Sequence, residues 1–151
     1  MELFADTTPK TAENFRAFCT DEKGTGKRGK PLHFKGSCFH DLVPKYAWFG
    51  GDITHGDGRG GESIYGGPFE NEKFVHNHDE GMLAMNTYRW DSNKSQFMIL
   101  MKKLHFLNGE HVVFGKVVEG LDLMRSIEKD VEAESGIPSK SVVITDCGQI
   151  S

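Results

Sequence analysis

The sequence lacks any apolar run that approaches the roughly 18 residues needed for a membrane-spanning helix. The first ten residues, MELFADTTPK, also lack the basic start, apolar middle and small-residue cleavage site of a secretory signal. These two absences argue against a membrane protein and against a secreted one. We therefore expect a cytoplasmic protein that has no membrane partner.

Cysteine is scarce, and positive charge is not in excess. Cys19, Cys38 and Cys147 are odd in number and widely spaced, which argues against a disulfide framework and indicates reduced, buried thiols. His76, His78 and the other histidines show no metal-ligand spacing, so we expect no metal and no cofactor. Lys and Arg total 18 against 22 Asp and Glu, and this net charge of -4 does not suit nucleic-acid binding.

The length of 151 residues suits a single domain, which we place at residues 1–151. Apolar residues at helical spacing predict one helix from Pro9, with Thr8 as its cap, to Cys19, and a second over 123–131. Many short strands with two helices indicate a mainly β fold, an antiparallel barrel capped by helices at its open ends. The predicted strands are 37–43, 46–49, 82–85, 97–101, 112–118 and 141–145.

The most informative stretch is residues 36–54, GSCFHDLVPKYAWFGGDIT. It is typical of a strand, a turn at Pro44-Lys45 and a second strand that stops at Gly50-Gly51. The stretch resembles the cyclophilin signature, in which FHR is followed by two apolar residues, proline, a variable residue, Phe, Met, a variable residue and QGGD. The frame is kept, but Asp41 stands at the arginine position and Phe49 at the glutamine position.

The resemblance covers nearly the whole chain. Segments similar to cyclophilin segments follow in the same order: ELFADTTPKTAENFRAFC, GGESIYGGPFENEKF, NGEHVVFGKVVEGLD and VVITDCGQIS. The loop KGTGKRGKPLH at 23–33 resembles the insertion of the divergent-loop subgroup familiar from plants. The family normally begins with a further strand before the point where Met1 stands. We therefore expect a barrel with its first strand missing and an unpaired sheet edge.

The resemblance implies a peptidyl-prolyl cis-trans isomerase, which catalyses rotation about the bond before proline against a barrier of about 18–20 kcal/mol. Such catalysis needs a pocket for the proline ring and a cationic donor whose bond to the proline nitrogen exists only in the transition state. An ionised Asp41 only accepts hydrogen bonds. Losing one charged donor costs roughly 1.5–3 kcal/mol, or about 10- to 150-fold in rate. We therefore expect catalysis that is weak or lost.

The resemblance also assigns the other positions of the site. Gln96 and His111 match catalytic positions of the family, and Met98 stands for the phenylalanine that floors its proline pocket. The Ala-Asn pair of the family is Asn86-Thr87 here, so a slip of one residue would let Asn86 hold the peptide backbone. The positions carried over to substrate binding are Tyr46, Phe49, Asn86, Thr87, Met98, Phe106 and Leu107.

Other interpretations stay open at this point. His111 could be a structural histidine, Tyr46, Met98 and Phe106 could be core residues, and Asp41 could be solvated or paired with Arg89. The chain could instead be a non-catalytic module that binds proline peptides, or a degenerate truncated product. We expect a monomer whose partners are proline-containing peptides or proteins, with weakened binding of cyclosporin-type cyclic peptides.

Cys19 and Cys147 match positions proposed as a redox pair in the divergent-loop subgroup, in which Glu62 holds the loop to the barrel. The alternative is two unpaired buried thiols. A bridge would require α-carbon atoms no more than about 7 Å apart.

Two further motifs carry no function. Residues 56–61, GDGRGG, match the dinucleotide pattern G-x-G-x-x-G, but no helical pattern follows, so we expect no nucleotide there. The sequence Asn93-Lys94-Ser95 is a glycosylation sequon that we expect to stay unmodified.

Overall fold

The computed structural model describes residues 1–131 and 136–151, which form a six-stranded antiparallel sheet, two α-helices and one 3-10 helix. The helices are α1 (Pro9–Thr20), α2 (Leu121–Val131) and η1 (His105–Leu107). The strands are β1 (Glu2–Leu3), β2 (Asp41–Val43), β3 (Ala47–Gly50), β4 (Met82–Met85), β5 (Phe97–Leu100) and β6 (Val113–Lys116).

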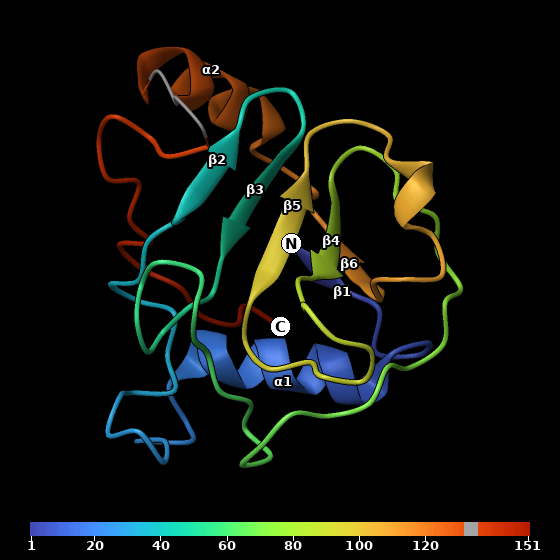
Figure 1. Cartoon of the computed structure of the whole chain (residues 1–151), viewed down its shortest axis with the longest axis vertical. Coiled ribbons are helices and arrows are strands. Elements are labelled where there is room, and N and C mark those ends of the chain that lie inside the picture. Colours follow the sequence, from blue (N-terminus) through green and yellow to red (C-terminus); the bar gives the residue numbers. More distant parts are fainter. Residues whose placement is uncertain (132–135) are drawn as a thin grey trace.

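The strands follow the order β1-β6-β4-β5-β3-β2, so β1 and β2 are the edges of the sheet. Helix α1 lies below the strands and α2 lies above them, at opposite ends of the sheet (Figure 1). This arrangement confirms the mainly β fold with two capping helices that the sequence predicts. The sheet itself is open, because no ladder joins β1 to β2 among the described residues.

The predicted strand at 141–145 is wrong in part, and so is the predicted start of the strand at 37–43. Val143 forms only an isolated antiparallel bridge with Cys38, and β2 begins at Asp41. The chain bends at His40, between the bridge and β2, so the pairing does not extend into a continuous ladder.

The prediction that Thr8 caps helix α1 is also wrong. The Thr8 hydroxyl donates to the carbonyl of Phe4 at 2.9 Å and makes no capping bond. Instead, the carboxylate of Glu72 accepts the backbone N–H groups of Lys10 at 3.1 Å and Thr11 at 2.6 Å. A negative group at this end also interacts favourably with the helix dipole. The cap therefore comes from a loop about 60 residues away in the sequence.

The two faces of the sheet are both apolar. Side chains of a strand alternate between faces, so one face carries the cross-strand row Leu42, Trp48, Ile99 and Leu83. These residues belong to the main core cluster, which they share with Phe15 and Phe18 of α1. The opposite face carries a second cluster that includes Ala47, Ala84, Met98, Leu100 and Val113. Strand β5 is buried on both faces.

The carboxylate of Glu128 fastens helix α2 to the sheet. The indole N–H of Trp48, a residue only 2% exposed, donates to a carboxylate oxygen of Glu128 at 2.9 Å. The same carboxylate accepts the backbone N–H of Lys45. A buried indole N–H without an acceptor would be destabilising, so Glu128 fixes where the helix lies over the β2–β3 turn.

The glycine-rich loop at 56–61 surrounds a carboxylate of the protein itself. Asp52, which is 2% exposed, accepts backbone N–H groups from residues of this loop and from the turn before it. The donors are Thr54, His55, Asp57, Gly58 and Gly60, at 2.9–3.2 Å. The amides that would cradle a phosphate in a dinucleotide fold are therefore occupied by Asp52.

The asparagine of the sequon is also buried and held by hydrogen bonds within the protein. Asn93 is fully buried, and its side-chain nitrogen donates to the Phe69 carbonyl at 3.1 Å and to Asn71 Oδ1 at 2.8 Å. An acceptor nitrogen in this position is not accessible for glycosylation.

The Asp52 loop makes stability depend on pH in a definite direction. Burial by itself raises the pKa of Asp52, but hydrogen bonds from the backbone of His55, Gly60, Gly58 and Thr54 together hold that pKa well below its usual range. As the pH falls, the unfolded chain therefore takes up a proton before the folded chain does. The stabilisation by Asp52 is fully present above the unfolded pKa of about 3.9 and is lost in more acidic solution.

We predict that Asp52→Asn lowers the free energy of unfolding at pH 7 by about 2 kcal/mol, because an amide offers one acceptor oxygen in place of two. We also predict a smaller loss of stability below pH 4 in this variant than in the parent chain. Urea unfolding at pH 7, 4 and 3 measures both effects. Asp6→Asn, a change at an exposed carboxylate, is the control. Equal acid sensitivity of Asp52→Asn and the parent would contradict the prediction.

Candidate functional site

The second apolar face brings together side chains from five strands. Antiparallel register places Asp41 opposite Phe49, Phe49 opposite Met98, Met98 opposite Ala84, and Ala84 opposite Val113. Residues opposite each other on adjacent strands have neighbouring side chains, so the five form one continuous row across the sheet. Four of the five members are apolar, and Asp41 stands at the end of the row on edge strand β2.

Three further predicted residues meet the row. Tyr46 and Leu107 pack against the same cluster as Met98 and Phe49. The ring of Phe106 lies 6.4 Å from that of Tyr46 between centroids and is 65% exposed. Met98 is only 3% exposed and forms the floor, whereas Tyr46 and Phe49 are half-buried. The site is therefore an apolar surface with a buried methionine beneath it and an exposed aromatic ring at its rim.

The polar end of the site is held by Gln96, which is 5% exposed. Its amide nitrogen donates to the carbonyls of Gly58 and Gly60, both at 2.8 Å. Its amide oxygen accepts from the side chain of Asn86 at 3.2 Å, while the Asn86 backbone N–H donates to the Gln96 carbonyl at 3.1 Å. Gln96 therefore fixes Asn86 next to the loop at 56–61. Both N–H groups of the Gln96 side chain already donate hydrogen bonds to that loop.

His111 and Thr87 make local bonds. The Nδ1 atom of His111 lies 3.0 Å from the carbonyl oxygen of Met85, so this nitrogen carries the proton and donates. The other ring nitrogen of a neutral His111 is then an acceptor. The Thr87 hydroxyl donates to the carbonyl of Arg89 within its own loop. The structure thus brings His111 next to β4 through Met85, whereas Thr87 is engaged in its own turn.

Asp41 is half-buried, and it lies next to the contact between Leu42 and Gly136 at the edge of the sheet. The N–H of Leu42 donates to the carbonyl of Gly136 at 2.6 Å, and a carboxylate oxygen of Asp41 lies 3.6 Å from the position a Cβ would take at Gly136. No ion pair joins Asp41 to Arg89 or to another basic side chain among residues 1–131 and 136–151. The neighbouring Phe49 supplies no hydrogen-bonding group.

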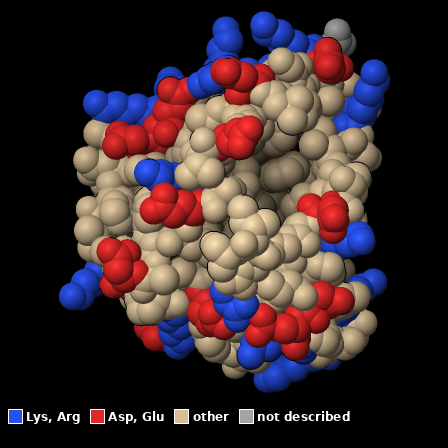
Figure 2. Space-filling view, turned by 180° about the vertical axis from the view of Figure 1, so that it is seen from behind, with Lys and Arg blue, Asp and Glu red and all other residues tan. Residues whose placement is uncertain are grey.

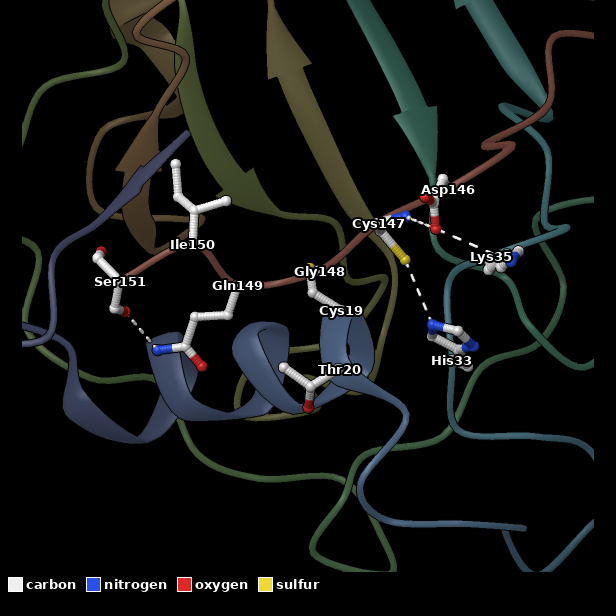
Figure 3. Close-up of a pocket in the computed structure, with 10 residues that line it drawn as sticks. All are labelled: Cys19, Thr20, His33, Lys35, Asp146, Cys147, Gly148, Gln149, Ile150 and Ser151. Atoms are coloured by element: carbon white, nitrogen blue, oxygen red, sulfur yellow. Dashed lines mark hydrogen bonds and ion pairs between the residues drawn. The ribbon is translucent and has the colours of Figure 1, made fainter.

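The two cysteines of the predicted redox pair line one pocket of about 650 Å³, between the end of α1 and the C-terminal segment (Figure 3). The Sγ atom of Cys147 lies 3.5 Å from Nε2 of His33, and Nδ1 of His33 lies 3.8 Å from a carboxylate oxygen of Asp21. Burial, together with the nearby Cys147, raises the pKa of Cys19 to about 12. Burial likewise raises the pKa of Cys147. Both thiols are free in this structure.

Glu62 holds the glycine-rich loop at 23–33, as predicted. Its carboxylate accepts the backbone N–H groups of Lys27 and Arg28, both at 2.9 Å. Gly26 packs so closely on Glu62 that a Cβ there would lie 2.5 Å from a carboxylate oxygen. The loop is therefore anchored through its backbone, and its basic side chains remain exposed.

Sequence analysis missed several residues that shape these sites. Tyr88 is 83% exposed, yet its hydroxyl donates to the Gly58 carbonyl at 3.2 Å and links the loop after β4 to the loop that surrounds Asp52. His33, which lines the cysteine pocket and lies 3.8 Å from Asp21, is another such residue. A local pattern could not reveal these contacts, because each joins segments that are distant in sequence or depends on a side-chain orientation.

None of the described helices is long and apolar enough to cross a membrane. Within residues 1–131 and 136–151, no group of three or more His, Cys, Asp or Glu side chains is arranged to hold a metal ion.

Comparison with protein families agrees with the fold. The family described as "Cyclophilin type peptidyl-prolyl cis-trans isomerase/CLD" matches residues 1–149. The match includes the sheet, both helices, the row from Asp41 to Val113 and the cysteine pocket up to Gln149. The chain belongs to the cyclophilin-type peptidyl-prolyl cis-trans isomerase family.

Proposed function

We propose that this chain binds proline-containing peptides on the second apolar face of its sheet, and that its isomerase activity is weak or lost. The observation that carries the proposal is the position of Asp41. It stands at one end of the row that continues through Phe49 to Met98, where the resemblance places an arginine. An apolar floor for a proline ring thus remains, while the group at its polar end has the opposite charge.

The chemistry follows from what each group can donate. Twisting the bond before proline frees the lone pair of the proline nitrogen, and a cation nearby stabilises that state. The Asp41 carboxylate cannot donate and repels substrate carbonyls. Gln96 already donates hydrogen bonds from both of its N–H groups to the carbonyls of Gly58 and Gly60. His111 donates a hydrogen bond from Nδ1 to the carbonyl of Met85. These groups therefore position the peptide and the loops, and they do not replace a guanidinium.

A non-catalytic module that binds proline peptides is the second candidate. It uses the same face, with Met98 as the floor and Phe106 at the rim, and it differs only in having no turnover. The Tyr46–Phe106 ring pair favours it, because this apolar rim is independent of Asp41. A degenerate product without function would bind no peptide at all.

We place the chain in the divergent-loop subgroup and regard it as a cytoplasmic monomer that binds cyclosporin-type cyclic peptides weakly. The anchoring of the 23–33 loop by Glu62 supports the subgroup. The weakened binding of cyclic peptides follows from the altered polar end of the face at Asp41 and Phe49.

We predict that Asp41→Arg raises the rate of proline isomerisation about 10- to 150-fold, because it restores one charged donor worth roughly 1.5–3 kcal/mol. A proline-isomerisation assay on a model peptide measures the effect. Val43→Arg is the matched control, because Val43 is exposed on the same strand and the same face. No gain in Asp41→Arg, with peptide binding intact, would show that other substitutions limit the reaction. Parent activity within tenfold of an ordinary cyclophilin would overturn the proposal itself.

We predict that Phe106→Ala weakens the binding of a proline peptide about 5- to 30-fold, because the exposed ring covers the peptide at the rim. Titration of a labelled proline peptide followed by fluorescence anisotropy measures the change. Phe74→Ala removes an equally large exposed ring that pairs with Trp90, 5.6 Å away, and serves as the control. An equal loss in both variants would place the peptide elsewhere.

We further propose that Cys19 and Cys147 are a redox pair, on the ground that both line one pocket. We predict that diamide, a two-electron thiol oxidant, converts the two thiols to one disulfide and takes up their hydrogens. The thiolate is the attacking species and burial raises both pKa values, so oxidation is slow at pH 7 and accelerates toward pH 9. Mass spectrometry of digests measures the bridge. It should be absent in Cys19→Ser and present in Cys38→Ser, and a bridge to Cys38 instead would contradict the pairing.

A further inference from the structure

The two cysteines of the pocket at the end of α1 differ in their polar surroundings. The Sγ atom of Cys147 lies 3.5 Å from Nε2 of His33, and the side chain is directed toward the ring (Figure 3). The thiol of Cys19, which lines the same pocket, makes no side-chain hydrogen bond within the described part of the chain. A thiol attacks as its thiolate, so a base beside one thiol makes that thiol the better nucleophile.

Backbone hydrogen bonds on two sides fix where the His33 ring lies. The N–H of the next residue, Phe34, donates to the carbonyl of Phe18 in α1 at 2.9 Å. The N–H of Gly36 donates to the carbonyl of Ile144 in the C-terminal segment at 2.7 Å. The side chain of His33 itself is only 17% exposed. The fold therefore holds this ring between α1 and the C-terminal segment.

The other ring nitrogen of His33 faces a carboxylate. Nδ1 lies 3.8 Å from a carboxylate oxygen of Asp21, the residue that ends α1 in the left-handed conformation with a φ of 61°. Glycine and asparagine are the usual residues in that conformation at a helix end, and a negative charge there opposes the helix dipole. The helix itself thus gains nothing from an aspartate. Its charge instead favours a proton on Nδ1, which leaves Nε2 free to accept one.

We propose that Cys147 is the thiol that attacks a small disulfide, with His33 as the acceptor of its proton and Asp21 as the residue that positions the ring. The proton of Cys147 passes to Nε2, and its sulfur bonds to one sulfur of the small disulfide. The disulfide bond breaks, and the leaving thiolate takes the proton from the ring. Cys19 then attacks Sγ of Cys147 and releases the second thiol, which takes up the Cys19 proton. Two protein thiols are oxidised to one bridge, and the small disulfide is reduced to two thiols.

Thiol acidity supports this order of attack. The pKa of Cys19 is raised to about 12, so this thiol is almost entirely protonated at neutral pH and is a poor first nucleophile. Burial also raises the pKa of Cys147, but Cys147 has a base in contact with it. The second step rests on the proposed redox pair. The first step needs only Cys147, His33 and Asp21.

The test measures each thiol by itself, with 4,4′-dithiodipyridine as the small disulfide and the absorbance of the released pyridine thione as the signal. Every chain carries Cys38→Ser, which removes the third thiol. At pH 7, the chain with Cys19→Ser added should react about tenfold faster, or more, than the chain with Cys147→Ser added. His33→Gln should slow the reaction of Cys147 about 3- to 30-fold, because its thiolate loses a neighbouring cation. His55→Gln, at an exposed histidine that lines an adjacent pocket, is the control.

The pH profile separates proton transfer from a structural role. The rate at Cys147 should fall between about pH 8 and pH 5, because a protonated histidine can no longer accept a proton. In His33→Gln this fall should vanish, so that the rate follows only the ionisation of the thiol at higher pH. The other titratable groups around His33, from the segments packed against it, are Cys19, Asp21, Lys35, Asp52, His55 and Asp146.

Asp21→Asn gives a further readout. It should slow Cys147 about threefold, the size expected for an exposed ion pair, while Tm stays the same or rises because asparagine suits the helix end. A lower Tm with an unchanged rate would show a structural role for Asp21 and contradict the proposal.

The remaining outcomes distinguish this proposal from the redox pair. Equal rates for the two single-thiol chains, no effect of His33→Gln, or an equal loss in His55→Gln would overturn it. Release of two thiones by the Cys38→Ser chain, with a bridge between Cys19 and Cys147, supports both steps. Release of one thione, with the adduct on Cys147, would support the role of His33 and show that the redox pair is wrong.

Discussion

The structure depends on burial of β5 on both of its faces. Phe97 and Ile99 point into the core that α1 covers, whereas Met98 and Leu100 point into the opposite cluster. A shift of one residue in the register of this strand would exchange the two sets and disrupt both clusters. The register of β5 therefore fixes where Phe49 and Asp41 lie, because Phe49 pairs with Met98 and Asp41 pairs with Phe49. The proposed peptide site is thus specified by the same packing that stabilises the fold.

Two kinds of polar contact then hold the loops on this scaffold. Asp52 gathers the backbone of the glycine-rich loop, and Gln96 fastens that loop to Asn86. Both side chains are nearly inaccessible to solvent, so each satisfies buried groups that would otherwise be left without partners. Gln96 stands at a position that resembles a catalytic one, and in this structure it positions the loop at 56–61 and Asn86. In the proposed function, the carboxylate of Asp41 sets the charge presented to a peptide, whereas Asp52 and Gln96 hold the loops.

Much of the fold could be predicted from local pattern. The strand at 82–85 and the helix beginning at Pro9 follow directly from apolar spacing. The cap from Glu72 and the carboxylate inside the glycine-rich loop could not be predicted. Glu72 lies about 60 residues from the helix it caps, and the loop matches a phosphate-binding pattern whose donors are used by Asp52. The strand predicted at 141–145 is only an isolated bridge at Val143. Alternation in the sequence shows which residues are apolar but not how far strand pairing continues.

The distant cap of α1 has a consequence for how the chain folds. Besides Glu72, the polar contacts of this helix include Asn14, whose side chain donates to the Lys94 carbonyl and accepts from Ile64. A helix of 12 residues is marginal in isolation, and these partners are contributed by segments synthesised 50 to 80 residues later. Stable formation of α1 therefore depends on the closure of long loops, a requirement that slows folding in chains with many non-local contacts. A nascent chain on the ribosome would expose Phe15 and Phe18 until β5, which shares their core cluster, had emerged.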